Sequence, residues 1–270
     1  MNKEEAVNKA TTTFNSAADY FDAPALCFWN RFGRRTIELA DLQSGMRVLD
    51  VCCGTGASAI PAAIQVGATG SVLGVDLANA LLELARKKSQ QQGLTNIEFQ
   101  CADFTNLDLP SASFDAIVCV FGIFFLPDME AAVAELWRML LPGGILAITS
   151  WGARVFEPAN QTFWSAIATE RPDLYKQFTP WYRIGEPASL QALVASCGAN
   201  NVKVVAETDS HHLASPEDWW LMVMGGGTRG TIDKLEPVTQ ERVKSVCLEF
   251  LTANNIQALD SDVLYAIARK

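Results

Sequence analysis

The stretch Val48-Leu49-Asp50-Val51-Cys52-Cys53-Gly54-Thr55-Gly56 decides the fold. An apolar run ends in an acid, passes through small residues and glycine, and opens into the alanine-rich segment 57–66. This order predicts a buried parallel strand, a tight turn and a helix. Glycines in such a turn let the backbone approach a ligand, and the helix N-terminus offers free N–H donors. The same pattern also occurs in α/β proteins that bind nothing at this turn.

A second and a third strand follow, and each ends in an acid. Asp76 closes the strand 71–76 and lies twenty residues after Gly56, the spacing at which a second-strand acid meets ribose hydroxyls in a βαβ unit. An amphipathic helix is expected from Leu77 to about Gln92. The next strand, 97–104, ends in Asp103 and Phe104, an acid suited to bind an adenine amino group and a ring suited to pack on its face.

The fourth strand, 114–120, is apolar and leads into an aromatic loop that contains Phe121 and Phe124. Ligands of doubly wound sheets lie beyond the carboxyl ends of the strands, so we expect these two rings to line an apolar pocket. The alternative is that they only fill space beneath a cap. A helix over 128–141 and a fifth strand over 145–151 complete the parallel core.

These segments together resemble the class I S-adenosylmethionine-dependent methyltransferases, and small-molecule enzymes of the ubiquinone/menaquinone-biosynthesis type look most similar. The resemblance covers about 20–151 and is carried by 48–56, Asp76, 102–104, 113–119 and 135–144. It implies a Rossmann-like, doubly wound α/β sheet of seven strands, mostly parallel with the last strand antiparallel, with N-terminal helices and a helical cap. By the same resemblance, the cofactor contacts are Tyr20, Asp50, Gly54, Thr55, Gly56, Asp76, Leu77, Asp103, Phe104 and Cys119. Cys52 stands where the family usually has its first glycine and is not carried over as a contact.

Length and composition are consistent with one domain that carries a cap. A chain of 270 residues with 49% hydrophobic residues can bury a substantial core. We divide it into an N-terminal helical lid (1–42), a cofactor-binding core (43–151) and a remainder (152–270) with cap insertions at 152–186 and 208–262. The formal net charge of −9 and the absence of a Lys/Arg cluster in the sequence disfavour a nucleic-acid partner.

Seven cysteines without Cys-x-x-Cys spacing, no signal peptide and no apolar run of membrane-spanning length predict a cytoplasmic protein with reduced thiols. Cysteines in apolar strands are expected to be core residues, so no metal is expected. The oligomeric state stays open.

The N-terminal segment is predicted to form helices over 4–19 and 24–40. In relatives of this kind such helices cover the cofactor and exclude water, which draws attention to Tyr20 and Phe21. Ordinary packing of an amphipathic helix explains these two rings equally well.

The C-terminal half is aromatic and less regular. A helix over 187–197, a sixth strand over 202–207 and a seventh over 263–268 are expected. Trp151, Trp181 and Trp220 are expected to line the substrate pocket with Phe121 and Phe124. The run Gly225-Gly226-Gly227 lacks a preceding strand and a following Lys-Ser/Thr, so it predicts a hinge or a helix end. Arg229 either holds an anionic group of the acceptor, such as a carboxylate, or forms an internal salt bridge.

The function expected from the resemblance is methyl transfer from S-adenosylmethionine to a small apolar or aromatic molecule by in-line displacement. Such a reaction depends mainly on proximity and orientation. The only base candidates are His211 and His212, placed just after the sixth strand; no catalytic residue is assigned. A non-catalytic S-adenosylmethionine-binding module is an alternative. A nicotinamide-dependent oxidoreductase is another, disfavoured by Asp103-Phe104 and the Leu-Pro-Gly-Gly segment.

Overall fold

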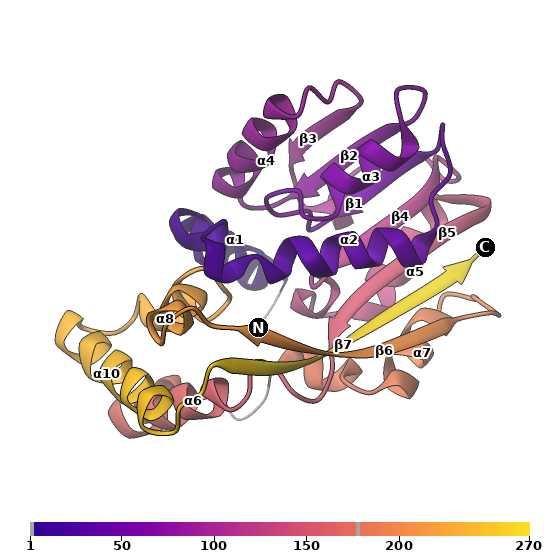
Figure 1. The fold of residues 1–270 in the computed structure, drawn as a ribbon. Helices are drawn as coiled ribbons and strands as arrows, with labels where there is room; N and C mark the ends of the chain where they lie inside the picture. Colours follow the sequence, from indigo (N-terminus) through magenta and orange to yellow (C-terminus); the bar gives the residue numbers. More distant parts are fainter. Residues whose placement is uncertain (1–2, 177–178) are drawn as a thin grey trace.

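A seven-stranded sheet runs through the computed structural model, which describes residues 3–176 and 179–270 (Figure 1). Its strands are β1 (Arg47–Val51), β2 (Ser71–Asp76), β3 (Ile97–Cys101), β4 (Phe114–Val120), β5 (Leu140–Trp151), β6 (Lys203–His212) and β7 (Ala258–Arg269). Their order across the sheet is β3-β2-β1-β4-β5-β7-β6.

The strands pair as predicted. β1 is parallel to β2 and β4, β2 to β3 and β4 to β5, whereas β7 is antiparallel to both β5 and β6. The chain leaves β1 first toward β2 and β3 and later returns to β4 on the other side of β1. Strand order therefore reverses between β1 and β4, and at such a switch point a crevice opens outside the carboxyl ends of the strands.

Ten α-helices lie in the described ranges and surround the sheet. They are α1 (Lys3–Phe21), α2 (Phe28–Ala40), α3 (Ala59–Val66), α4 (Asn79–Gln91), α5 (Met129–Met139), α6 (Ala159–Glu170), α7 (Pro187–Ala195), α8 (Glu217–Met224), α9 (Arg229–Ile232) and α10 (Pro237–Ala253). The short 3₁₀ segments are η1 (Pro24–Leu26), η2 (Phe104–Asn106), η3 (Ile123–Phe125), η4 (Pro172–Leu174) and η5 (Pro180–Ile184).

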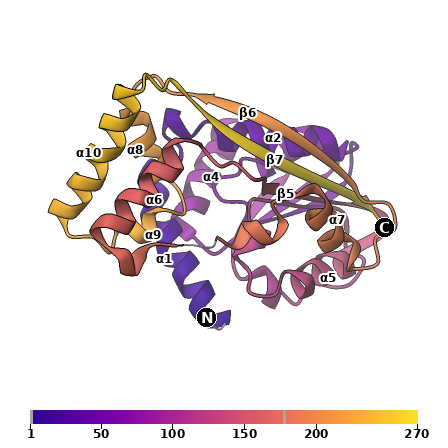
Figure 2. The same cartoon turned by 90° about the horizontal axis from the view of Figure 1, so that it is seen from below.

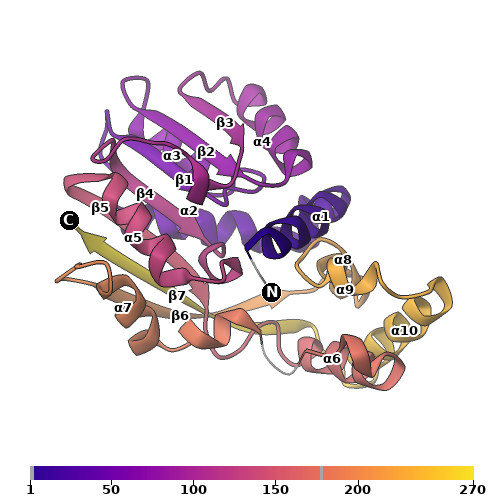
Figure 3. The ribbon, with the colours of Figure 1, turned by 180° about the vertical axis from the view of Figure 1, so that it is seen from behind.

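Both faces of the sheet are covered. α2, α3 and α4 lie on one face (Figure 1), and α5 and α7 lie on the other (Figure 3). Successive residues of a strand point to opposite faces, so Val48 packs in one hydrophobic cluster with Ala62 of α3, while Leu49 packs in the other with Leu136 of α5. This two-sided burial explains why the strands are apolar runs without alternation.

The cap lies beyond the carboxyl ends of the parallel strands. α6 packs along α10, and α8 and α9 pack against α1, which also contacts α4 of the core (Figure 2). α1 therefore bridges core and cap. The helical excursion between the last two strands is shorter than its expected range of 208–262, because β6 continues to His212 and β7 begins at Ala258.

Several predicted boundaries move for local reasons. The helix expected over 24–40 divides at Cys27 into the 3₁₀ turn η1 and α2. The strand expected to reach Phe104 stops at Cys101, because Asp103 caps η2 by accepting from the backbone N–H of Thr105. The glycine run 225–227 follows the end of a helix, one of its two predicted roles, since α8 ends at Met224 with Gly225 as its C-cap. Before α8, Asp218 accepts from the N–H of Ala214 at 2.6 Å.

Candidate functional site

The predicted cofactor residues Asp50, Asp76 and Cys119 come together at the carboxyl ends of three neighbouring strands. Val51 of β1 is the register partner of Val75 in β2 and of Cys119 in β4. Asp50 and Asp76 therefore end adjacent strands, and the glycine loop that follows β1 lies between them.

The glycine loop has the left-handed backbone that its sequence predicts. Gly54 and Gly56 adopt φ values of +53° and +84°, which glycine reaches without steric cost. Cys52 also adopts a positive φ of +57°, a conformation that a side chain with a Cβ disfavours. This backbone suits glycine, the residue that the resembling family usually has at this position, and here a cysteine adopts it.

Asp50 is fully buried and only half satisfied. Its Oδ2 accepts a hydrogen bond of 2.6 Å from the hydroxyl of Ser58, whereas Oδ1 has no partner among the described residues. Burial raises the pKa of the Asp50 carboxyl from its ordinary 3.8 to about 7; the Ser58 hydroxyl opposes this rise and Asp76 adds to it. An unfilled acceptor beside the loop fits the amine and hydroxyl donors of a nucleoside-type cofactor.

Asp76 is held in place by the loop it faces. Its Oδ2 accepts from the backbone N–H of Gly54 at 2.8 Å, and its Oδ1 accepts from that of Ala78 at 2.8 Å, one residue beyond Leu77. Burial raises the pKa of Asp76, and the backbone donors oppose the rise. The carboxylate is therefore fixed in orientation and keeps lone pairs for a ligand diol.

The predicted adenine pair directly follows β3. Asp103 Oδ1 accepts from the N–H and the hydroxyl of Thr105 at 2.9 and 2.6 Å, which fixes the turn, and Phe104 is 4% exposed. The structure thus places both residues at the same strand edge as Asp76, whose register partner is Cys101 at the end of β3.

α1 closes over the glycine loop. A Cβ added to Gly54 would lie 3.8 Å from the ring of Phe21, so this ring covers the loop. Asp22 Oδ1 accepts from the hydroxyl of Thr55 and from Lys88 Nζ, both at 2.8 Å. Sequence reasoning missed Asp22, because these partners lie 33 and 66 residues away along the chain. Tyr20 faces the cap instead: its ring centre lies 6.0 Å from Arg229 Cζ.

The predicted substrate residues form two aromatic contacts. Phe121 stacks on Trp151 with ring centres 4.1 Å apart, and Phe124 meets Trp181 edge to face at 5.7 Å. Trp29 joins the first pair at 5.6 Å from Phe121. The sequence did not single out Trp29, because a single aromatic residue on an amphipathic helix is usually a core residue.

Two of these aromatic residues have indole nitrogens without hydrogen-bond partners among the described residues. Within the described ranges, the indole N–H groups of Trp29 and Trp181 are buried and unpaired. Trp220 is half-buried and packs at the edge of the main hydrophobic cluster, while its neighbour Trp219 is buried and faces Phe156 at 6.5 Å. The mainly apolar surroundings therefore carry a few isolated hydrogen-bond donors.

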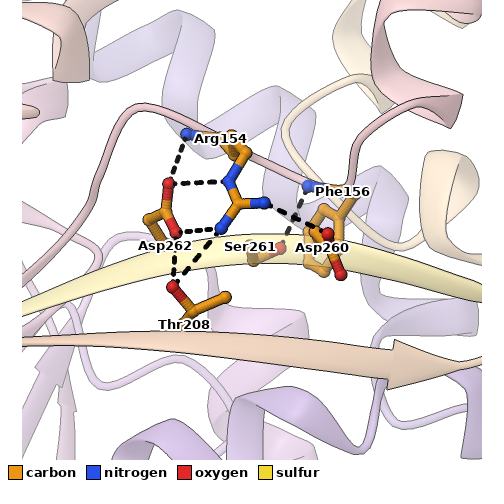
Figure 4. Close-up of polar contacts among 6 residues, drawn as sticks. All are labelled: Arg154, Phe156, Thr208, Asp260, Ser261 and Asp262. Atoms are coloured by element: carbon orange, nitrogen blue, oxygen red, sulfur yellow. Dashed lines mark hydrogen bonds and ion pairs between the residues drawn. The ribbon is translucent and has the colours of Figure 1, made fainter.

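A polar network fixes the segment that follows β5 (Figure 4). Arg154 donates to Asp262 from Nη2 at 2.8 Å and to Asp260 from Nη1 at 3.1 Å, and the backbone N–H of Phe156 donates to Ser261 Oγ at 3.0 Å. The Arg154 guanidinium lowers the pKa of Asp262. These contacts hold the chain against β7 and so place Trp151 and Phe156.

The two histidines lie within β6, so the expectation that they follow the sixth strand was wrong. The strand extends because its last residues pair with Ala258 and Leu259 of β7. His211 is 3% exposed, its Nε2 lies 2.9 Å from the carbonyl oxygen of Ala25, and burial lowers its pKa, with Arg31 adding to the effect. His212 is exposed and its Nδ1 lies 2.5 Å from the carbonyl oxygen of Gln257.

A separate cavity of about 550 Å³ lies between α2 and the strands β6 and β7. None of the predicted site residues lines it, and its rim carries the ion pairs of Arg31 with Asp209 and of Arg35 with Glu207. The predicted cofactor residues Asp50 and Asp76 lie instead at the strand ends, beside the glycine loop that the end of α1 covers.

Residues 3–176 and 179–270 contain no group of three or more His, Cys, Asp or Glu side chains arranged to hold a metal ion. In the same part of the chain, no helix is long and apolar enough to cross a membrane.

Comparison with known proteins shows that part of the chain is similar to methyltransferases. Residues 48–144 match the family described as "Methyltransferase domain". The chain is 36% identical over 142 residues to aklanonic acid methyltransferase DauC from Streptomyces sp. (strain C5), covering 53% of this chain and 64% of that protein. It is 33% identical over 146 residues to demethylmenaquinone methyltransferase from Listeria welshimeri, covering 54% of this chain and 62% of that protein. The matches thus span less than two thirds of these curated relatives.

The fold has solved counterparts. A SAM dependent methyltransferase from Aquifex aeolicus is similar with a TM-score of 0.55 and 22% identity, over 71% of this chain and 91% of that one. At this identity the likeness concerns the fold.

Proposed function

From the match of residues 48–144 to the methyltransferase domain family, we propose that the chain transfers a methyl group from S-adenosylmethionine to a small apolar or aromatic molecule by in-line displacement. The relatives named above act on small molecules according to their names, which supports this acceptor class. The cofactor would bind at Asp50, the glycine loop and Asp76.

The observation that carries the proposal is the pair of carboxylates beside the glycine loop. Asp50 is buried and Asp76 is half-buried, and Asp50 keeps one oxygen without a partner among the described residues. Carboxylates attract ammonium and hydroxyl groups and repel phosphate. This arrangement supports a cofactor with an amino acid and a ribose, and it disfavours the pyrophosphate of a nicotinamide dinucleotide.

The chain's own residues would act by positioning and by excluding water. Phe21 and α1 cover the loop, and the stacked pair Phe121 and Trp151 offers a flat apolar wall. When bound, S-adenosylmethionine supplies a methyl group on a sulfonium centre whose leaving group is a neutral thioether. Holding the reactants in a dry, aligned geometry then accounts for most of the acceleration.

A general base is not part of the proposal. Nε2 of His211 contacts the carbonyl oxygen of Ala25, and Nδ1 of His212 contacts that of Gln257. Whether either histidine serves as a base stays a prediction, which single His211→Gln and His212→Gln variants test through the pH profile of turnover.

The test is calorimetric titration of the full chain with S-adenosylhomocysteine and, separately, with NAD. We expect saturable binding of S-adenosylhomocysteine alone, followed by transfer of label from methyl-labelled S-adenosylmethionine to an aromatic acceptor pool. Binding of NAD alone would overturn the proposal in favour of an oxidoreductase. Binding of S-adenosylhomocysteine without transfer to any acceptor would support a non-catalytic binding module.

A further inference from the structure

Arg229 is a partly satisfied cation enclosed between the cap and α1. Its side chain is 18% exposed, and its Nε donates to Asp233 Oδ1 at 2.5 Å. Its Nη1 is buried and has no hydrogen-bond partner in the part of the chain that the structure describes. Leaving such a donor unpaired costs free energy, more for a charged group than for a neutral one. Arg229 thus forms the internal salt bridge that the sequence offered as one alternative, but its Nη1 takes no part in that salt bridge.

The surroundings of Arg229 connect it to the aromatic loop. Its guanidinium lies over the ring of Tyr20 in α1, and a Cβ at Gly227 would lie 3.9 Å from the ring of Phe125 in η3. Gly230, which directly follows Arg229, packs closely against Thr13 of α1. A Cβ at Gly230 would lie 2.3 Å from the Thr13 hydroxyl oxygen. Thr13 of α1 and Gly230 of α9 therefore mark a contact between the two helices, which we call the α1–α9 seam. This seam begins beside the loop that carries Phe121 and Phe124.

Three lysines gather at the outer end of this seam. Lys9 lies one turn before Thr13 on α1, Lys234 follows α9, and Lys176 places its ammonium 5.1 Å from the ring centre of Trp164. Burial lowers the pKa of Lys176 to about 8, and the charges of Lys9 and Lys234 add to the effect.

No ion pair joins these lysines to an acid within the described ranges. Among the acids close to these lysines along the chain, Asp233 pairs with Arg229 and Asp173 with Arg171. Glu4 and Glu5 precede Lys9 on α1, and Glu236 follows Lys234. Lys9 and Lys234 nevertheless repel the ammonium of Lys176, and the lowered pKa of Lys176 reflects this. An anion between α1 and α9 would relieve the repulsion.

We propose that the methyl acceptor carries a carboxylate, which binds the Nη1 edge of Arg229 in the seam between α1 and α9. This inference rests on the proposed function and adds the charge of the substrate to it. A planar guanidinium matches a carboxylate in shape and charge. Lys9, Lys176 and Lys234 attract the anion toward the seam and raise its association rate.

The first experiment follows the arginine Nε–Hε resonances of the full chain by NMR during titration with acetate at constant ionic strength. Acetate is the smallest organic carboxylate, and acetamide is its neutral counterpart. Arg229→Met identifies the Arg229 resonance. Arg242, which pairs with Glu170 between α10 and α6, is the internal control. We expect a saturable shift of Arg229 with acetate, no shift with acetamide, and no shift of Arg242. A static Arg229 resonance, or equal shifts with both probes, would overturn the proposal.

A surface variant keeps the inference testable if Arg229→Met fails to fold. Lys234 is exposed, so Lys234→Met leaves the packing intact, and we expect acetate binding to weaken about two- to fivefold with a shallower salt dependence. Unchanged affinity in Lys234→Met would contradict the role of the lysines.

The second experiment separates the two carboxylates that could reach Arg229, that of the acceptor and that of the cofactor. S-adenosylhomocysteine is titrated into the wild type, Arg229→Met and Arg242→Met. Equal affinities support the proposal, whereas a loss confined to Arg229→Met would assign Arg229 to the cofactor and overturn it. If S-adenosylhomocysteine binds none of the three, the proposed function fails while the acetate experiment still reports on Arg229.

Discussion

The hydroxyl of Thr55 in the glycine loop donates a hydrogen bond of 2.8 Å to the carboxylate of Asp22, the residue that follows α1. The same carboxylate oxygen accepts from Lys88 Nζ in α4, also at 2.8 Å. Because Phe21 lies against Gly54, these bonds hold α1 over the loop. The end of α1 is therefore tied to the loop at which the cofactor is proposed to bind.

Asp22→Ala should loosen α1. The substitution removes one hydrogen bond and one half-exposed ion pair, together about 1–2 kcal/mol. We expect the amides of α1 to exchange with solvent about 5- to 30-fold faster, as measured by hydrogen exchange of the free protein. Asp19→Ala is the matched control, because Asp19 is an exposed acid of the same helix. Equal exchange rates in the two variants would show that Asp22 does not restrain α1.

Asp76→Ala should weaken binding of S-adenosylhomocysteine by about 1–3 kcal/mol, because the ligand's hydroxyls lose their acceptor and Gly54 loses the partner of its N–H. Calorimetric titration measures the change. Asp115→Ala is the control: Asp115 is also half-buried and accepts a backbone N–H, that of Arg47, but at the amino end of the sheet. An affinity of Asp76→Ala equal to that of the control would remove Asp76 from the cofactor site.

Asp50 should make the stability of the free protein fall as pH rises. The pKa of Asp50 in the folded protein, about 7, exceeds its ordinary value of 3.8. Below pH 3.8 Asp50 is protonated in both the folded and the unfolded protein, so it does not reduce the free energy of unfolding. Between these values the unfolded chain releases its proton while the folded chain retains it, and stability declines until about pH 7. Asp50→Asn cannot ionise and should escape this loss.

The difference in free energy of unfolding between Asp50→Asn and the wild type should therefore grow from pH 4 to pH 7, by up to roughly 4 kcal/mol, and then stay constant. Urea denaturation at a series of pH values measures it. Other titrating groups are common to both proteins and cancel in the difference. A gap that does not change with pH would mean that Asp50 is ionised throughout.

Gly122→Ala should destabilise the protein through a contact with Cys52. The backbone of Gly122 has φ −110°, which alanine accepts, but a Cβ there would lie 2.4 Å from Cys52 Cβ and 2.7 Å from Cys52 Sγ. We expect a loss of about 1–3 kcal/mol from this overpacking.

A double-mutant cycle identifies the cause. Cys52→Gly removes both clashing atoms and suits the positive φ at this position, so Gly122→Ala should cost much less in that background. Chemical denaturation of the four proteins gives the coupling free energy. Equal costs with Cys52 and with glycine would place the strain elsewhere, for example at Cys119 Sγ, which lies 3.0 Å from the added Cβ.

The positions of the candidate residues could be predicted best where these residues lie at or just after the end of a strand. Asp50, Asp76 and Asp103 could be placed from the sequence, because the end of a parallel strand fixes the edge at which its side chains lie. The aromatic residues could be named but not paired. That Phe121 stacks on Trp151 while Phe124 meets Trp181 depends on how η3 and η5 pack, and no local pattern encodes it.

The sequence by itself determined the order and type of the core elements, because hydrophobic runs, glycine turns and helix caps act over a few residues and leave their pattern in the chain. It also indicated the antiparallel last strand through the family resemblance. Only the tertiary structure decided that Asp22 ties α1 to the glycine loop and that His211 and His212 belong to β6. It alone also decided that one nitrogen of Arg229 has no partner among the residues that the structure describes. These contacts join residues far apart in the chain, and their free energy arises only when the packed elements bring them together.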